Sequence, residues 1–128
     1  MFIENRSKYS LEETISKLTE AISKSDWKVI HTHDLQQLMR KNGHEVLSVK
    51  VIEICAPKFA YKLLSTDNER VYSNMMPCRL SVYEKSDGAV YVSRMNIGKF
   101  SLSFGGVVTD VMSDAFRDAE KFIAQVIE

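Results

Sequence analysis

The sequence predicts an α+β fold of two layers: a mostly antiparallel sheet, helices packed on one face, and a long C-terminal helix. Three observations carry this prediction. A helix with a marked start begins at Ser10, two strands joined by an Asp-Gly turn cover 77–95, and a long amphipathic helix follows Gly105-Gly106. We expect residues 1–128 to form a single domain, because this length suits one well-packed core better than two.

The first part of the chain alternates strands and helices. Residues 2–8 are predicted to form a strand of thin apolar content. Ser10 and Glu13 have the spacing of a capping box, in which each side chain bonds an orphan backbone N–H of the first turn. An apolar stripe at helical spacing follows: Leu11, Ile15, Leu18 and Ile22. Trp27–His33 is predicted as a strand, and Asp34 as the N-cap of a short helix.

Val46–Cys55 gives the strongest strand signal, because it is rich in β-branched residues. Its alternation slips after Val51, where Ile52 and Ile54 take the face opposite to that of the preceding valines. A β-bulge, or burial of the strand on both faces, explains this slip. The pattern favours neither explanation.

The second half of the chain is predicted to hold a hairpin between helices. Pro57 suits the first position of a helix, where its missing N–H has no cost. Pro77–Glu84 and Ala89–Met95 are predicted as strands joined through Lys85–Gly88. Over Phe100–Phe104 apolar and polar residues alternate, which predicts a short strand or an extended linker. The predicted order is therefore β-α-β-α-β-α-β-β-α.

Charge and hydropathy exclude several classes of partner. Seventeen basic residues balance seventeen acidic ones, and no Lys/Arg cluster stands out, so we expect no nucleic-acid partner. No apolar run approaches the roughly 18 residues of a membrane span, and no secretory signal opens the chain, so we expect no membrane partner. We expect a cytoplasmic protein, in which the two cysteines are reduced thiols.

Several short motifs are spread along most of the chain. Two of them hold both cysteines and both prolines: Glu53-Ile54-Cys55-Ala56-Pro57 and Met76-Pro77-Cys78-Arg79. The others are His33-Asp34-Leu35, Val82-Tyr83-Glu84, Asp87-Gly88 and Arg94-Met95-Asn96, with Ser7, Glu13-Thr14, Ala60 and Phe104-Gly105-Gly106. In these motifs the chain resembles the bacterial and archaeal family catalogued as domain of unknown function 302. The resemblance implies a fold similar to the TATA-box-binding-protein-like class and a homodimer. It implies no activity, because the family has none assigned. The fold similarity does not imply DNA binding either, because function resides in sites and not in folds.

The two cysteines are the first candidates for a functional site. Cys55 ends a strand just before the helix that Pro57 opens, where the positive end of the helix dipole favours a thiolate. Cys78 shares a strand face with Leu80 and Val82, the expected core side. Both cysteines also fit the description of small buried apolar residues. Two cysteines without a CxxC motif do not by themselves make a zinc site.

A carboxylate and a polar-aromatic surface extend this candidate site. Glu53 on an apolar strand face would have a raised pKa and could act as an acid or base. A bulge would instead turn Glu53 to solvent or to Arg79, and we favour an ion pair with Arg79. The surface opposite the helices suits a dimer interface, a ligand or plain solvation; its members are Arg79, Ser81, Tyr83, Tyr91, Ser93 and Met95.

His31 and His33 are the candidate metal ligands. They stand two positions apart on a predicted strand, and so are expected to share a face with Trp27 and Val29. This spacing can chelate a transition metal if Cys55 lies on an adjacent strand. Alternatively, His33 packs beside the helix cap and His31 lies at a sheet edge.

We therefore predict a homodimeric small-molecule-binding or interaction module without a cofactor, and favour binding over enzymatic activity. Its partners are a second copy of the chain and a small-molecule ligand, held by Glu53, Cys55, Cys78, Arg79 and Tyr83. The alternative is a thiol-, metal- or haem-dependent sensor or enzyme that uses Cys55, Cys78 and His33.

Overall fold

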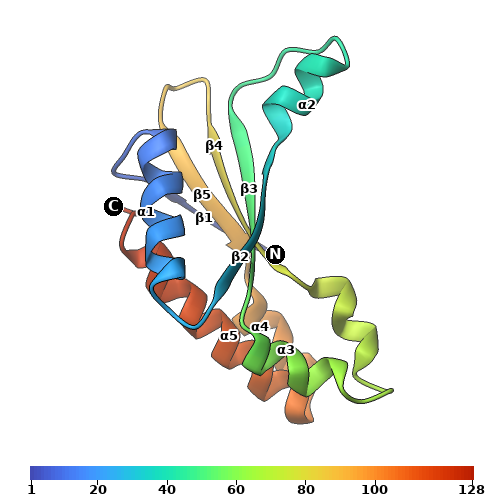
Figure 1. Cartoon of the computed structure of the whole chain (residues 1–128). Helices are drawn as coiled ribbons and strands as arrows, with labels where there is room; N and C mark the ends of the chain where they lie inside the picture. The colour runs from blue at the N-terminus through green and yellow to red at the C-terminus, as the bar shows by residue number, and fades with distance from the viewer.

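The computed structural model describes residues 1–128 and contains one five-stranded sheet with helices packed on one face (Figure 1). The strands lie in the order β1-β5-β4-β3-β2, and every neighbouring pair is antiparallel. The strands are β1 (Phe2–Arg6), β2 (Lys28–Asp34), β3 (Val49–Cys55), β4 (Cys78–Glu84) and β5 (Val90–Met95). The predicted α+β class and antiparallel sheet are confirmed.

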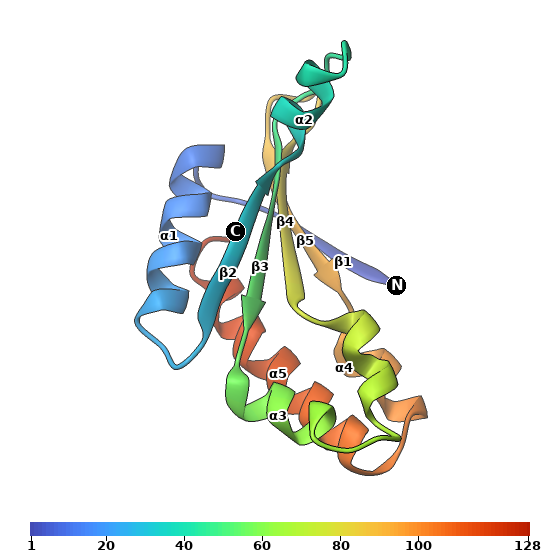
Figure 2. The same cartoon turned by 45° about the vertical axis from the view of Figure 1, so that its right-hand side comes forward.

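The helices lie beside the sheet and at its ends. They are α1 (Leu11–Ser23), α2 (Leu35–Lys41), α3 (Pro57–Leu64), α4 (Ile97–Phe100) and α5 (Gly106–Ala124), with the 3-10 helices η1 (Arg70–Met75) and η2 (Ser101–Ser103). Helices α1 and α5 cover one face of the sheet, α3 packs on α5, and α2 projects beyond the far end of the strands (Figures 1 and 2). We call the opposite side of the sheet the uncovered face. None of the helices is both long and apolar enough to cross a membrane.

The predicted helix starts are found where the sequence placed them. The Ser10 hydroxyl accepts a hydrogen bond from the backbone N–H of Glu13, at 3.2 Å. The Asp34 carboxylate accepts one from the N–H of Gln37, at 3.0 Å. Each bond satisfies a backbone donor that the helix itself leaves free. Pro57 occupies the first turn of α3, as expected.

The core lies between the sheet and helices α1 and α5. Its largest cluster contains fifteen buried side chains, including Leu18, Ile22, Ile52, Leu80 and Ile123. Burying a side chain of this kind contributes about 1.5–3 kcal/mol relative to leaving it in water. The inward residues of β3, β4 and β5 thereby hold the sheet against α5.

The bulge of the sheet lies in β2 and not in β3. Between Val29 and His31 the pairing with β3 shifts, so Ile30 has no partner opposite it. Strand β3 pairs regularly with β4, and its valines on the uncovered face are only half-buried. The slip in the β3 pattern therefore reflects partial burial on both faces. The β2 bulge turns His31 and His33 away from the core side on which Trp27 packs, so the predicted common face is wrong.

The segment Phe100–Phe104 is helical, so the predicted short strand or linker is wrong. The Asn96 carbonyl accepts hydrogen bonds from the N–H groups of Lys99 and Phe100, which starts a helical turn. Ser101 is fully buried at the next turn, and Phe104 packs against a second apolar cluster beside α5. This packing overrides the local alternation of apolar and polar residues.

Candidate ligand-binding site

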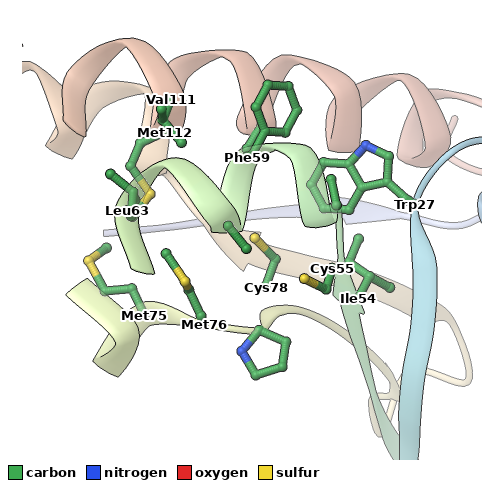
Figure 3. Close-up of a pocket in the computed structure, with 14 residues that line it drawn as sticks. Trp27, Ile54, Cys55, Phe59, Leu63, Met75, Met76, Cys78, Val111 and Met112 are labelled. Carbon is green, nitrogen blue, oxygen red and sulfur yellow. The ribbon is translucent and has the colours of Figure 1, made fainter. Parts of the chain in front are cut away.

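Two adjoining cavities lie where the sheet meets α5. Strand β3 ends at Cys55 and turns into α3, and η1 leads into β4 at Cys78. These two strand ends are neighbours, because Ile54 pairs directly with Cys78. Helices α3, η1 and α5 cover the space beyond these strand ends, and a cavity remains between the strand ends and the helices (Figure 3).

The smaller cavity has a volume of about 40 Å³, and thirteen of its fourteen lining residues are hydrophobic. Cys55 and Cys78 form part of its wall, together with Trp27, Phe59 and Leu63 (Figure 3). A water molecule needs roughly 10–15 Å³ of such space. The smaller cavity is therefore large enough for an ion or a few waters and too small for an organic ligand.

Both thiols are free and have raised pKa values. Burial raises the pKa of the Cys78 thiol to about 11, and the nearby Cys55 adds to the rise. Burial also raises the pKa of Cys55. The expected thiolate at the start of α3 is therefore not favoured, because burial disfavours the charged form of the Cys55 thiol. A nucleophilic role requires the opposite shift of the pKa.

The larger cavity, of about 180 Å³, lies on the other side of Cys78. Cys78 lines both cavities and separates them, together with Met75, Pro77, Met112 and Ala115. Nine of the thirteen residues around the larger cavity are hydrophobic, and its polar members are Asn74, Arg79 and Arg94. Pockets of this composition, with a few polar groups in an apolar wall, are typical of small-molecule sites.

Arg94 is the buried polar group of the larger cavity, only 8% exposed. Its Nε and Nη2 donate to the two carboxylate oxygens of Glu120 at 2.8 and 2.6 Å, and its Nη1 donates to Asn5 at 2.6 Å. Of the five N–H bonds of a guanidinium group, these contacts use three. Two N–H bonds thus have no protein partner.

Arg94 was missed by the sequence reasoning, although a signal for it exists. In β5 it alternates with Val90 and Val92, both buried, so its side chain belongs to the core face. A charged residue on such a face needs a partner. That partner, Glu120, stands on the long helix, and sequence spacing alone does not reveal the pairing.

Glu53 lies on the uncovered face and does not line either cavity. Its carboxylate accepts a hydrogen bond from His33 Nε2 and lies 3.6 Å from Arg79 Nε. The favoured ion pair with Arg79 is therefore present, because the two residues are paired in register. The pKa of Glu53 is lowered, chiefly by the His33 hydrogen bond, which overturns the expectation of a raised value.

The predicted metal ligands do not come together. His31 and His33 stack edge to face with ring centroids 4.4 Å apart, but His33 is held by Glu53 and Cys55 lines the smaller cavity. No group of three or more His, Cys, Asp or Glu side chains is placed to hold a metal ion. The set of His31, His33 and Cys55 therefore has no geometric support.

Tyr83 belongs to a polar network on the uncovered face. Its hydroxyl donates to Glu4, which also accepts from Lys85, and its ring stacks on that of Tyr91 with centroids 6.4 Å apart. Of the five predicted ligand-binding residues, Cys55, Cys78 and Arg79 line cavities, whereas Glu53 and Tyr83 do not.

The fold and cavities define an α+β domain with an apolar site between the end of an antiparallel sheet and its long C-terminal helix. The chain belongs to the family described as "Domain of unknown function DUF302", whose model matches residues 3–128. It is 27% identical over 111 residues to an uncharacterised protein of Aquifex aeolicus (strain VF5), covering 87% of this chain and 70% of that protein. The crystal structure of an uncharacterised conserved DUF302 protein from Bacillus stearothermophilus has a similar fold, with a TM-score of 0.82, 15% identity and 94% of each chain covered.

Proposed function

We propose that this chain binds a small, largely apolar molecule in the larger cavity. The observation that carries the proposal is a space of about 180 Å³ with a mainly apolar wall and one buried guanidinium group. A dry apolar cavity of about 150 Å³ is known to hold benzene. The larger cavity is therefore suited to one six-membered ring or a branched chain with a small polar substituent.

The charge around Arg94 determines which polar substituent fits. Glu120 neutralises the guanidinium through a bidentate pair, and two of the N–H bonds of Arg94 have no protein partner. A neutral acceptor, such as a ketone or ester carbonyl, can use a free N–H bond without bringing a second negative charge beside Glu120. A buried carboxylate would repel Glu120 at a cost that the neutral acceptor avoids.

Acetophenone and ethylbenzene are matched probes for this proposal, because they differ chiefly in the carbonyl oxygen. We expect ligand-observed NMR to show that acetophenone binds, and that ethylbenzene binds more weakly. Ala119→Leu should weaken both, because Ala119 lines only the larger cavity. Ala124→Leu is the matched control, since Ala124 is exposed on the same helix.

Thermal melts of both variants establish that they fold. The proposal is overturned if neither probe binds in the millimolar range, or if Ala119→Leu binds both as well as the wild type does. Equal binding of the two probes would show that Arg94 does not bind the carbonyl oxygen, and the site would then be a purely apolar cavity.

We also propose that two copies associate through the uncovered face. Phe2 and Met95 pair there at the sheet edge, and they are 66% and 38% exposed. The same face carries charges of both signs, Glu4 and Glu53 against Arg6 and Arg79. Charges of both signs on one face support this proposal, because they allow a second copy turned about a two-fold axis to pair with them.

Light scattering after size exclusion tests this association. We expect twice the 14.6 kDa chain mass for the wild type, and the mass of one chain for Phe2→Glu. Leu102→Glu should remain dimeric, because Leu102 is as exposed as Phe2 but lies in η2, away from this face. A monomeric wild type would refute the proposal, and so would an unaffected Phe2→Glu variant.

A further inference from the structure

Sulfur atoms are concentrated around the smaller cavity. The chain has six methionines and two cysteines, and five of these eight residues line this one space: Cys55, Cys78, Met75, Met76 and Met112. The lining includes no histidine and no carboxylate. The only indole nitrogen there, Trp27 Nε1, already donates to Asp118 at 3.1 Å. The side-chain atoms that remain free to bind a ligand are therefore sulfurs.

The fold brings these sulfurs together from separate elements. Cys55 is the last residue of β3 and Cys78 is the first of β4, so the two lie at neighbouring strand ends, and both line the smaller cavity. Figure 3 shows the Cys55 sulfur turned toward Cys78. Met76 stands two residues before Cys78 and lines the same space. Two thiols and a thioether thus surround one volume of about 40 Å³.

The chemistry of this lining selects one class of ion. Mg²⁺ and Ca²⁺ require oxygen ligands, which the lining does not offer from side chains. Structural Zn²⁺ takes four cysteine or histidine ligands, and only two cysteines are present. Thiolate and thioether sulfurs are the soft ligands that Cu(I) prefers. The volume suffices for one ion and excludes an organic molecule.

We propose that the smaller cavity binds one Cu(I) ion through the sulfurs of Cys55 and Cys78, with the Met76 thioether as a third ligand. Each thiol loses its proton to solvent as its bond to copper forms, so the complex carries one net negative charge. That charge lies at the N-terminus of α3, which begins two residues after Cys55 and has no capping side chain. The positive end of the helix dipole stabilises it there.

Anaerobic titration with Cu(I) against the chromogenic chelator bicinchoninate tests the site in the full chain. We expect one Cu(I) retained per chain, confirmed by native mass spectrometry. Cys55→Ser and Cys78→Ser should each reduce retention by at least about tenfold, and Met76→Leu by less. Met39→Leu is the matched control and should leave retention unchanged, because Met39 lies on α2 outside the cavity.

X-ray absorption spectroscopy of the copper-loaded wild type identifies the ligand atoms around copper without any variant. It therefore tests the site even if a cysteine variant fails to fold. We expect sulfur ligands alone around copper. Nitrogen or oxygen ligands, no retention against the chelator, or full retention in both cysteine variants would each overturn the proposal. Probe binding in the larger cavity, with its dependence on Ala119, is a separate measurement, so either proposal can fail alone.

Discussion

Arg94 on β5 and Glu120 on α5 form a bidentate ion pair that ties the sheet to the C-terminal helix. The Arg94 side chain is 7% exposed and that of Glu120 is 30% exposed, so water reaches mainly the Glu120 side. Removing one partner of such a pair destabilises the protein, because the charge of the other partner then stays buried without an opposite charge beside it. It also orients the guanidinium toward the larger cavity wall.

Arg94→Met should lower the free energy of unfolding by about 3 kcal/mol, the low end for a broken buried pair, because Glu120 regains water. Urea unfolding measures this loss. Arg117→Met removes the exposed pair with Asp114 and should cost less than about 1 kcal/mol. Adding Glu120→Leu to Arg94→Met should recover part of the loss. Equal costs for the two arginine variants would contradict this role of Arg94.

Glu53 should make stability depend on acid pH. Its pKa is held below the ordinary 4.5, first by His33 and then by Arg79. Because the folded pKa is the lower one, the stabilisation is present above the unfolded pKa and is lost as pH falls through the folded value. Glu53→Gln should therefore be less stable than wild type at neutral pH, and the difference should vanish in acid.

Unfolding curves of wild type and Glu53→Gln across the acid range measure this effect. Glu45→Gln is the control, because Glu45 is exposed and its pair with Arg40 spans 3.5 Å on the surface. A stability difference for Glu53→Gln that stays constant or grows in acid would show that the carboxylate is not stabilised by its two partners.

Gly98→Ala should distort the wall of the larger cavity. A Cβ atom at this position would lie 2.8 Å from Cδ1 of Phe116, which lines that cavity. The clash should cost about 1–3 kcal/mol, as overpacking does. Phe116→Leu shortens the side chain, so Gly98→Ala should cost less in the Phe116→Leu background. If Gly98→Ala costs the same stability in both backgrounds, the clash with Phe116 is not the cause of the loss.

Cys78 should alkylate slowly in the folded protein. With a pKa of about 11, its thiolate population at neutral pH is on the order of 300-fold below that of an ordinary cysteine near 8.5. Iodoacetamide labelling of the Cys55→Ser variant, followed by mass spectrometry, reports Cys78 alone. Unfolding in urea should restore an ordinary rate. A labelling rate in the native protein equal to that in the unfolded protein would show that the fold neither shields the Cys78 thiol nor raises its pKa.

Local patterns in the sequence predicted most of the fold. The Ser10 cap, Pro57 at the start of α3 and the Asp-Gly turn each depend on neighbouring residues, and all three occur as expected. The bulge at Ile30 escaped prediction, because a one-residue shift shows only when β2 is paired with β3. The helical segment after Asn96 was missed for a similar reason, since burial of Ser101 decides it.

The candidate site was predicted only in part. Cys55, Cys78 and Arg79 stood out because they belong to the two motifs that hold both prolines, and they do line the cavities. The contributions of Met112 and Glu120 depend on how α5 crosses the sheet, which no local spacing records. Strand alternation placed Cys78 on the core side with its partner Ile54, whereas Cys55 lines the same cavity at the point where β3 ends and the chain turns into α3.

Methyl NMR of protein labelled at methionine and alanine methyl groups tests the central claim most directly. On titration with acetophenone we expect the signals of Met112 and Ala119 to shift together with one dissociation constant, because both line the larger cavity. The Met39 signal, on α2, should not move. Unchanged Met112 and Ala119 signals at saturating probe, or shifts confined to Met1 and Met39, which line neither cavity, would contradict the claim that this cavity binds a small molecule.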